Sequence, residues 1–224
     1  MGRLVVPLLI GTLGAAVLVS LGLWQVQRLA WKEAVLGEIE ARIAADPVPL
    51  PQTPDPEADR YRPVAVTGTI SGDDLRVLIS AKGVGPAYRI IAPLTLEDGR
   101  RVMVDRGYVP DAQKNTPRPG GQASITGNLH WPDEIDGFTP DNDVANNIWF
   151  ARDVPVMAEA LGTEPVLIIA RQTSESDPVV TPLPVDTSGI PNDHLQYAVT
   201  WFGLAAVWIL MTGLWVRRIV RGTG

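Results

Sequence analysis

The chain has 224 residues, a formal net charge of −6 and no cysteine. The acidic balance argues against nucleic acid as a partner, because phosphates require a basic protein face. The lack of cysteine excludes disulfides, thiolate nucleophiles, iron–sulfur clusters and Cys-ligated zinc or copper. His130 and His194 are the two imidazole side chains that remain, so we expect a protein that is not an enzyme.

Uncharged apolar runs near both ends of the chain predict two transmembrane helices. The first run, Leu4 to Trp24, has 21 residues, and the second, Ala198 to Val216, has 19. A helix of about 20 residues crosses the hydrocarbon core of a bilayer. We interpret the first run as a retained anchor rather than a cleaved signal peptide, because it exceeds the usual signal core and no small-residue cleavage motif follows it.

The distribution of charge predicts the orientation of the chain in the membrane. Arg3 precedes the first span and an Arg-rich tail follows the second, so both termini are expected in the cytoplasm. The segment between the spans holds 15 basic and all 25 acidic residues, a net charge of −10, and is expected in the periplasm. No Arg- and Ser-rich import segment precedes the first span, which favours a bacterial cytoplasmic (inner) membrane over an organelle.

These patterns divide the chain into five segments. They are transmembrane helix 1 (1–24), its helical extension (25–46), a periplasmic β-rich domain (47–196), transmembrane helix 2 (197–216) and a basic cytoplasmic tail (217–224). Apolar residues at helical spacing from Leu29 to Ile43 predict the extension. Closely spaced prolines from Pro47 to Pro56 then rule out further helix.

The middle segment has the pattern of a mainly antiparallel β-sheet or barrel with one short helix, which makes the chain an α+β membrane protein. Strand-like runs occur at residues 61–70, 75–80, 88–96, 101–109, 123–131, 146–151 and 165–172. Asp98-Gly99 is a hairpin turn signal. Asp153 is a typical helix N-cap, with Gly162 as the stop. A flat sheet and a barrel both fit this order of elements.

His194, directly before the second span, is the main candidate for a ligand. An imidazole at the outer membrane boundary could bind a membrane-soluble cofactor such as haem, or it could hydrogen-bond to backbone and headgroups. Arg28 and Lys32, just outside the first span, could face lipid phosphate or haem propionates. His130 is expected to be a structural or surface residue. No phosphate loop, nucleophile elbow or metal-hydrolase spacing is present in the sequence.

Four motifs, in order, resemble the surfeit locus protein 1 family. They are Gly22-Leu23-Trp24-Gln25-Val26-Gln27-Arg28 with Trp31-Lys32; Tyr61-Arg62-Pro63-Val64 with Gly68 and Tyr88 to Pro93; Val104-Asp105-Arg106-Gly107-Tyr108-Val109-Pro110; and Asn192-Asp193-His194-Leu195-Gln196-Tyr197-Ala198-Val199-Thr200-Trp201-Phe202. The resemblance runs from about Gly22 to Trp208, which is nearly the whole chain.

The resemblance implies an assembly factor for haem–copper cytochrome c oxidase, active while the catalytic subunit receives haem a. The expected partners are that catalytic subunit, a haem a synthase and the lipid membrane. The family's proposed haem a ligand falls on His194, so this residue is the candidate axial ligand of the haem iron, with haem a bound transiently.

The amphipathic shape of haem a suggests roles for the residues near His194. Trp24 or Trp201 would form an apolar wall, Arg28 would pair with the propionates, and Tyr197 completes the candidate cofactor-binding set. The alternative is a membrane scaffold or chaperone without a cofactor. In that case the spans clamp the nascent oxidase subunit and His194 is structural.

Overall fold

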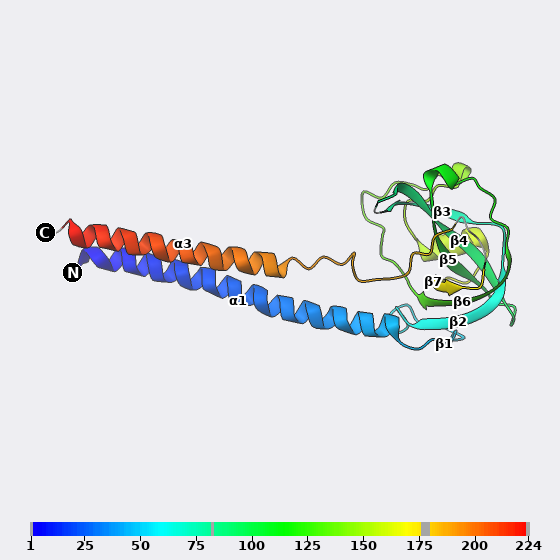
Figure 1. Ribbon diagram of the computed structural model, residues 1–224, viewed down its shortest axis with the longest axis horizontal. Helices are drawn as coiled ribbons and strands as arrows, with labels where there is room; N and C mark the ends of the chain where they lie inside the picture. The colour runs from blue at the N-terminus through cyan, green and yellow to red at the C-terminus, as the bar shows by residue number, and fades with distance from the viewer. Residues whose placement is uncertain (1, 82, 176–179, 223–224) are drawn as a thin grey trace. The chain divides into compact units, whose positions relative to one another are not determined.

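The structure is a computed structural model that describes residues 2–81, 83–175 and 180–222 (Figure 1). Its internal contacts divide the chain into two units. The helical unit consists of Met1–Glu38 and Thr187–Gly224, and the strand-rich unit consists of Ile39–Asp186.

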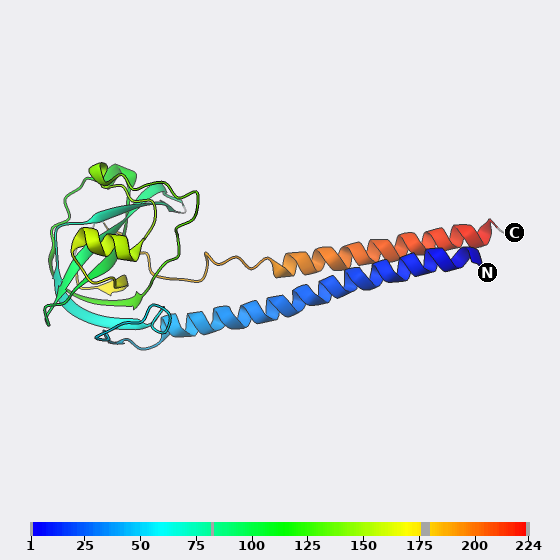
Figure 2. The same ribbon diagram turned by 180° about the vertical axis from the view of Figure 1, so that it is seen from behind.

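Two long apolar helices lie side by side in the helical unit (Figures 1 and 2). α1 runs from Gly2 to Ala44 without a break, and α3 runs from His194 to Arg221. Both are long and apolar enough to cross a membrane, and few residues of their apolar windows are buried within the protein. Exposed apolar surface of this extent is typical of a membrane protein, in which lipid covers the helices.

Glycines allow α1 and α3 to pack closely as an antiparallel pair. A Cβ atom added to them would lie 2.1, 2.4 and 2.7 Å from side-chain atoms on α3; the facing pairs are Gly11 and Thr212, Gly14 and Trp208, and Gly22 and Phe202. Trp208 Nε1 also donates a hydrogen bond to the carbonyl oxygen of Gly11, at 3.1 Å. Small residues at the contact are the usual means by which membrane helices approach each other.

The strand-rich unit contains a seven-stranded, mainly antiparallel sheet in the order β1-β2-β6-β7-β5-β4-β3. The strands are β1 (Val48–Pro49), β2 (Pro63–Ile70), β3 (Leu75–Ala81), β4 (Gly85–Leu96), β5 (Arg101–Pro110), β6 (Gly121–Leu129) and β7 (Leu167–Thr173). The pairs β1–β2 and β5–β7 are parallel. Short 3-10 helices, η1 (Asp111–Gln113) and η2 (Val144–Asn146), lie in the loops.

Pairing between β2 and β4 closes the sheet into a barrel. Residues Gly68 to Ile70 of β2 pair with Leu94 to Leu96 of β4, while the other side of β2 pairs with β6. The ring β2-β6-β7-β5-β4 is therefore closed, with β1 and β3 attached at its sides. Glycine is needed at the closing point, because a Cβ at Gly68 would lie 2.3 Å from the carbonyl oxygen of Thr95. Of the two architectures that fit the sequence, the barrel is the one that forms.

The predicted short helix is confirmed as α2 (Val154–Leu161), which packs against the barrel core. The Asp153 carboxylate caps it by accepting from the N–H of Val156, and Gly162 ends it with φ +63°. Met157, fully buried, joins the same apolar cluster as the inward-facing residues of β4 and β5. A cap and a stop that are local in sequence explain why this helix could be predicted.

The predicted strand at 146–151 is wrong, because this segment forms a loop. Asn147 adopts a left-handed conformation with φ +53°, which interrupts an extended chain. The loop is held instead by Trp149, whose N–H donates to the Arg76 carbonyl and whose carbonyl accepts from the Leu78 N–H of β3. Trp149 is 3% exposed, so the apolar residues that suggested a strand serve as an anchor for the loop.

Candidate functional site

His194 is the first residue of α3 and forms a hydrogen bond with α1. Its Nδ1 lies 2.8 Å from Oε1 of Gln25. Gln25 is 8% exposed although it directly follows the apolar run of α1. A side-chain amide buried between apolar helices needs a polar partner, and the imidazole is that partner. The structure therefore brings together a polar pair where α3 begins.

Trp24 and Arg28, two of the predicted site residues, lie on one stripe of α1 together with Trp31. The guanidinium carbon of Arg28 is 4.4 Å from the centroid of the Trp31 ring, a cation–π contact. Trp24 and Trp31 are about half exposed. A guanidinium that stacks by its face keeps its in-plane N–H donors for an anion, so the stripe combines apolar surface with a cation.

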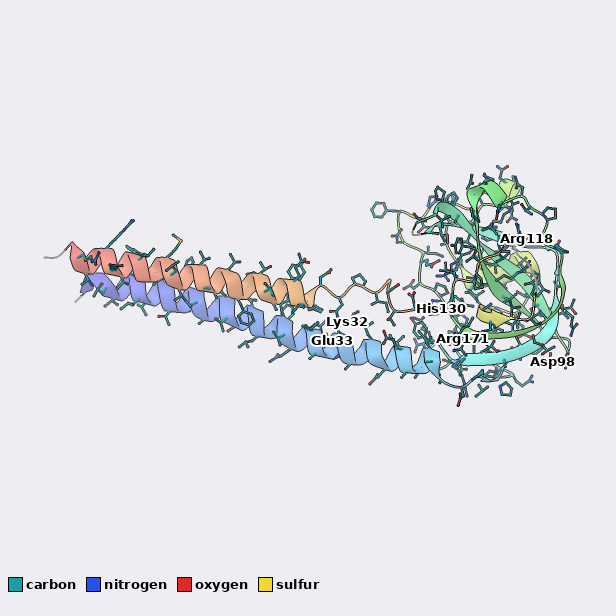
Figure 3. All side chains as sticks on the ribbon, viewed as in Figure 1. Lys32, Glu33, Asp98, Arg118, His130 and Arg171 are labelled. Carbon is teal, nitrogen blue, oxygen red and sulfur yellow. The ribbon has the colours of Figure 1, made fainter. Side chains whose placement is uncertain are left out.

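Tyr197 and Trp201 follow His194 at i+3 and i+7, so these three predicted site residues share one side of α3. Tyr197 is 55% exposed and Trp201 is partly buried. Aromatic surface therefore extends along α3 from the imidazole. Lys32 lies about two turns beyond Gln25 along α1, past the beginning of α3, with Glu33 beside it (Figure 3). Lys32 is thus separate from the Gln25–His194 pair.

The residues at this site suit a porphyrin better than a free metal ion. No group of three or more His, Asp or Glu side chains that could hold a metal ion occurs among the described residues. A haem supplies four nitrogen ligands itself and needs axial ligands from the protein. The imidazole of His194, the nearby aromatic side chains and the Arg28 guanidinium are groups that match the iron, the macrocycle and the propionates.

Gln25 is the residue that the sequence-based choice of site residues missed. It was recognised within a motif, but no contact could be assigned to it. The feature of the sequence that could have identified Gln25 is its position directly after 21 uncharged residues. An unpaired amide at that position would be costly. The partner of Gln25 lies 169 positions away, and only the packing of the two helices reveals it.

The second histidine, His130, lies in the strand-rich unit just after β6 (Figure 3). Its backbone N–H donates to the Leu167 carbonyl at 3.0 Å, and its ring stacks on Tyr61 with centroids 5.1 Å apart. Burial and the positive charges of Arg152 and Arg60 lower its pKa from 6.5 to about 4. A neutral, stacked and largely buried imidazole is typical of a structural histidine.

The titration of His130 predicts that the strand-rich unit loses stability in mild acid. Between pH 6.5 and pH 4 the unfolded chain binds a proton that the folded ring does not, so the free energy of unfolding falls as the pH is lowered through this window. We expect wild type to lose about 2 kcal/mol more than His130→Gln between pH 7.5 and pH 5. Hydrogen exchange of the full-length protein in detergent at the two pH values measures this difference. Equal losses would contradict the prediction.

The charged side chains of the motif around Asp105 in β5 make contacts within the strand-rich unit. Asp105 is fully buried, forms an ion pair with Arg89 and accepts from the N–H of Gly107 at 3.0 Å. Arg152 Nη1 lies 3.8 Å from the same carboxylate. Arg106 Nε donates to Glu175 at 3.0 Å. Both charged side chains of the Asp-Arg-Gly sequence are therefore paired within the strand-rich unit.

Comparison with known proteins shows that the chain is similar to members of one family. The model of the SURF1 family matches residues 12–206. Surfeit locus protein 1 of Homo sapiens is 34% identical over 230 residues, which cover 91% of this chain and 74% of that protein. Surfeit locus protein 1 of Xenopus tropicalis is 33% identical over 229 residues, covering 90% and 72%. The SURF1-like protein of Monosiga brevicollis is 34% identical over 213 residues, covering 86% and 80%.

Proposed function

The chain belongs to the SURF1 family, and on that premise we propose that it is a non-enzymatic assembly factor for haem–copper cytochrome c oxidase. In this role it assists the insertion of haem a into the catalytic subunit. The observation that carries the proposal is the Gln25–His194 pair, because it leaves one imidazole nitrogen for a ligand beside exposed aromatic surface.

Haem a is the cargo in this proposal. His194 would bind the iron. Trp24, Tyr197 and Trp201 would cover apolar parts of the macrocycle, and Arg28 would pair with the propionates. One imidazole without a thiolate is a modest anchor, which suits a protein that must release its cargo. The catalytic subunit receives the haem a, and a haem a synthase is the donor.

The proposed location is a bacterial cytoplasmic membrane, with both termini in the cytoplasm and the strand-rich unit in the periplasm. The basic residues at the C-terminal end of α3 and the net charge of −10 between the two apolar runs support this orientation. The antiparallel packing of α1 and α3 supports it as well, since two spans that pack in this way place both chain ends on one side of the membrane (Figure 1).

Optical titration of the purified full-length protein with haem a tests the cargo proposal. We expect a saturable, near-stoichiometric shift of the haem absorption with wild type, and affinity at least about tenfold lower, or about 1.4 kcal/mol, for His194→Ala. His130→Gln is the matched control, since it removes the other imidazole and leaves α1 and α3 unchanged. Wild-type affinity in His194→Ala would show that His194 is not the ligand.

A membrane scaffold without a cofactor is the second candidate, and the loop between β6 and α2 favours it. Ile135, Phe138 and Val144 in this loop are 54%, 94% and 68% exposed. In the scaffold role, these exposed side chains would contact the nascent oxidase subunit. If wild type takes up haem a only as detergent does, this scaffold role becomes the better account.

A further inference from the structure

The hydrogen bond between Gln25 and His194 joins α1 to α3, and it also affects the His194 ring. We infer that Gln25 is a positioning residue, which holds the His194 ring in its Nδ1–H tautomer and thereby presents Nε2 as the nitrogen that binds the cargo. The inference rests on the proposed function in so far as it names haem a, but the tautomer itself is a property of the protein alone.

The first step is the direction of the hydrogen bond. The atom of Gln25 that faces His194 Nδ1 at 2.8 Å is the amide oxygen, Oε1. A carbonyl oxygen accepts and does not donate, so Nδ1 carries the proton. A neutral imidazole has one ring proton, and its lone pair is then on Nε2.

The second step is that the His194 ring has no hydrogen-bond partner that competes with Gln25. Gln25 is 8% exposed, so bulk water has little access to its amide. Within the described part of the chain, Nε2 of His194 has no hydrogen-bond partner. The lone pair on Nε2 is therefore the free coordinating position of a half-buried ring, since the other nitrogen is occupied by α1.

The third step is the effect of this hydrogen bond on the imidazole as a metal ligand. A hydrogen bond from the second ring nitrogen fixes the orientation of a coordinating imidazole and makes the coordinating nitrogen more basic. Loss of such a partner weakens metal binding by about 10- to 100-fold. In water, free imidazole side chains favour the opposite tautomer, with the proton on Nε2, so the helix pair selects the less common form.

A structural role for Gln25 must be separated from this positioning role. The same two helices share a second hydrogen bond, from Trp208 Nε1 to the Gly11 carbonyl at 3.1 Å. Trp208→Phe removes that bond and leaves the imidazole untouched, so it is the matched control for loosened helix packing. Gln25→Glu is the conservative rescue, because a carboxylate oxygen still accepts from Nδ1–H.

The experiment has two readouts on the full-length protein in detergent. Nitrogen-15 NMR of the histidine rings without haem reports the tautomer, with His130→Gln used to assign the His194 signals. Titration with haem a reports affinity. We expect the Nδ1–H tautomer in wild type, Gln25→Glu and Trp208→Phe, and a change towards Nε2–H in Gln25→Leu with about 10- to 100-fold weaker haem a binding.

The outcomes separate this inference from the proposed function. An Nε2–H tautomer in wild type, or unchanged haem a affinity in Gln25→Leu, overturns the positioning role while haem binding through His194 stands. Equal weakening in Trp208→Phe and Gln25→Leu overturns it too, in favour of helix packing. If the tautomer is as expected but His194→Ala binds haem a like wild type, the proposed ligand is overturned instead.

Discussion

Replacement of Asp105 by asparagine is expected to lower the free energy of unfolding of the strand-rich unit by about 3–5 kcal/mol. The Asp105 carboxylate is fully buried, pairs with Arg89 and lies 3.8 Å from Arg152 Nη1. The side chains of both arginines are about nine-tenths buried. Asparagine keeps the shape but removes the charge, so the buried Arg89 loses its counter-ion and Arg152 is left with its ion pair to Glu134.

Hydrogen exchange in the full-length protein, followed at the protected amides of β4 and β5, measures this loss. The matched control is Asp111→Asn, which breaks the ion pair of Asp111 with Lys114 on the surface, where the carboxylate side chain is 52% exposed. An exposed pair contributes less than about 1 kcal/mol. A loss in Asp105→Asn no larger than that of the control would mean that the buried cluster does not stabilise the barrel.

The elements that the sequence predicts well carry local signals. The apolar runs of α1 and α3, the Asp153 cap of α2 and the Asp98-Gly99 hairpin each depend on a few consecutive residues. In the hairpin, Gly99 has φ +87° and the N–H of Leu96 donates to the Arg100 carbonyl. Such signals do not depend on the rest of the fold.

The elements that escaped prediction depend on contacts between distant residues. Closure of the barrel needs β2 to meet β4 at Gly68, and nothing near Gly68 in the sequence specifies that encounter. β1 lies in a proline-rich stretch and exists through its parallel pairing with β2. The loop at 146–151 has the apolar content of a strand, but the left-handed Asn147 and the buried Trp149 make it an anchor.

The same division applies to the candidate site. Position before an apolar run, together with a motif, was enough to select His194. The stacking of Arg28 on Trp31 follows from i, i+3 spacing on a helix and could have been predicted. The Gln25–His194 bond could not, because it requires the register between two helices that are far apart in the sequence.

Replacement of Gly107 by alanine is expected to destabilise the strand-rich unit by about 3 kcal/mol or more. Gly107 has φ +121°, which L-residues rarely adopt, and an added Cβ would lie 2.1 Å from the carbonyl oxygen of Thr181. That oxygen accepts from the N–H of Tyr108, and the Thr181 N–H donates back to Tyr108. Alanine would therefore strain β5 and displace the segment that contains Thr181, so the amides of Tyr108 and Thr181 should lose protection from hydrogen exchange first.

Gly99→Ala separates the two causes of this effect. Gly99 also has positive φ, but open space surrounds the position of its Cβ, so its substitution costs only the backbone strain of about 1–2 kcal/mol. A similar loss in both variants would mean that the Thr181 segment moves aside easily. A clearly larger loss in Gly107→Ala would mean that the segment is held in place. In that case the Asp-Arg-Gly sequence has a joint structural role, since Asp105 accepts from the Gly107 N–H, Gly107 admits the Thr181 segment, and Arg106 pairs with Glu175.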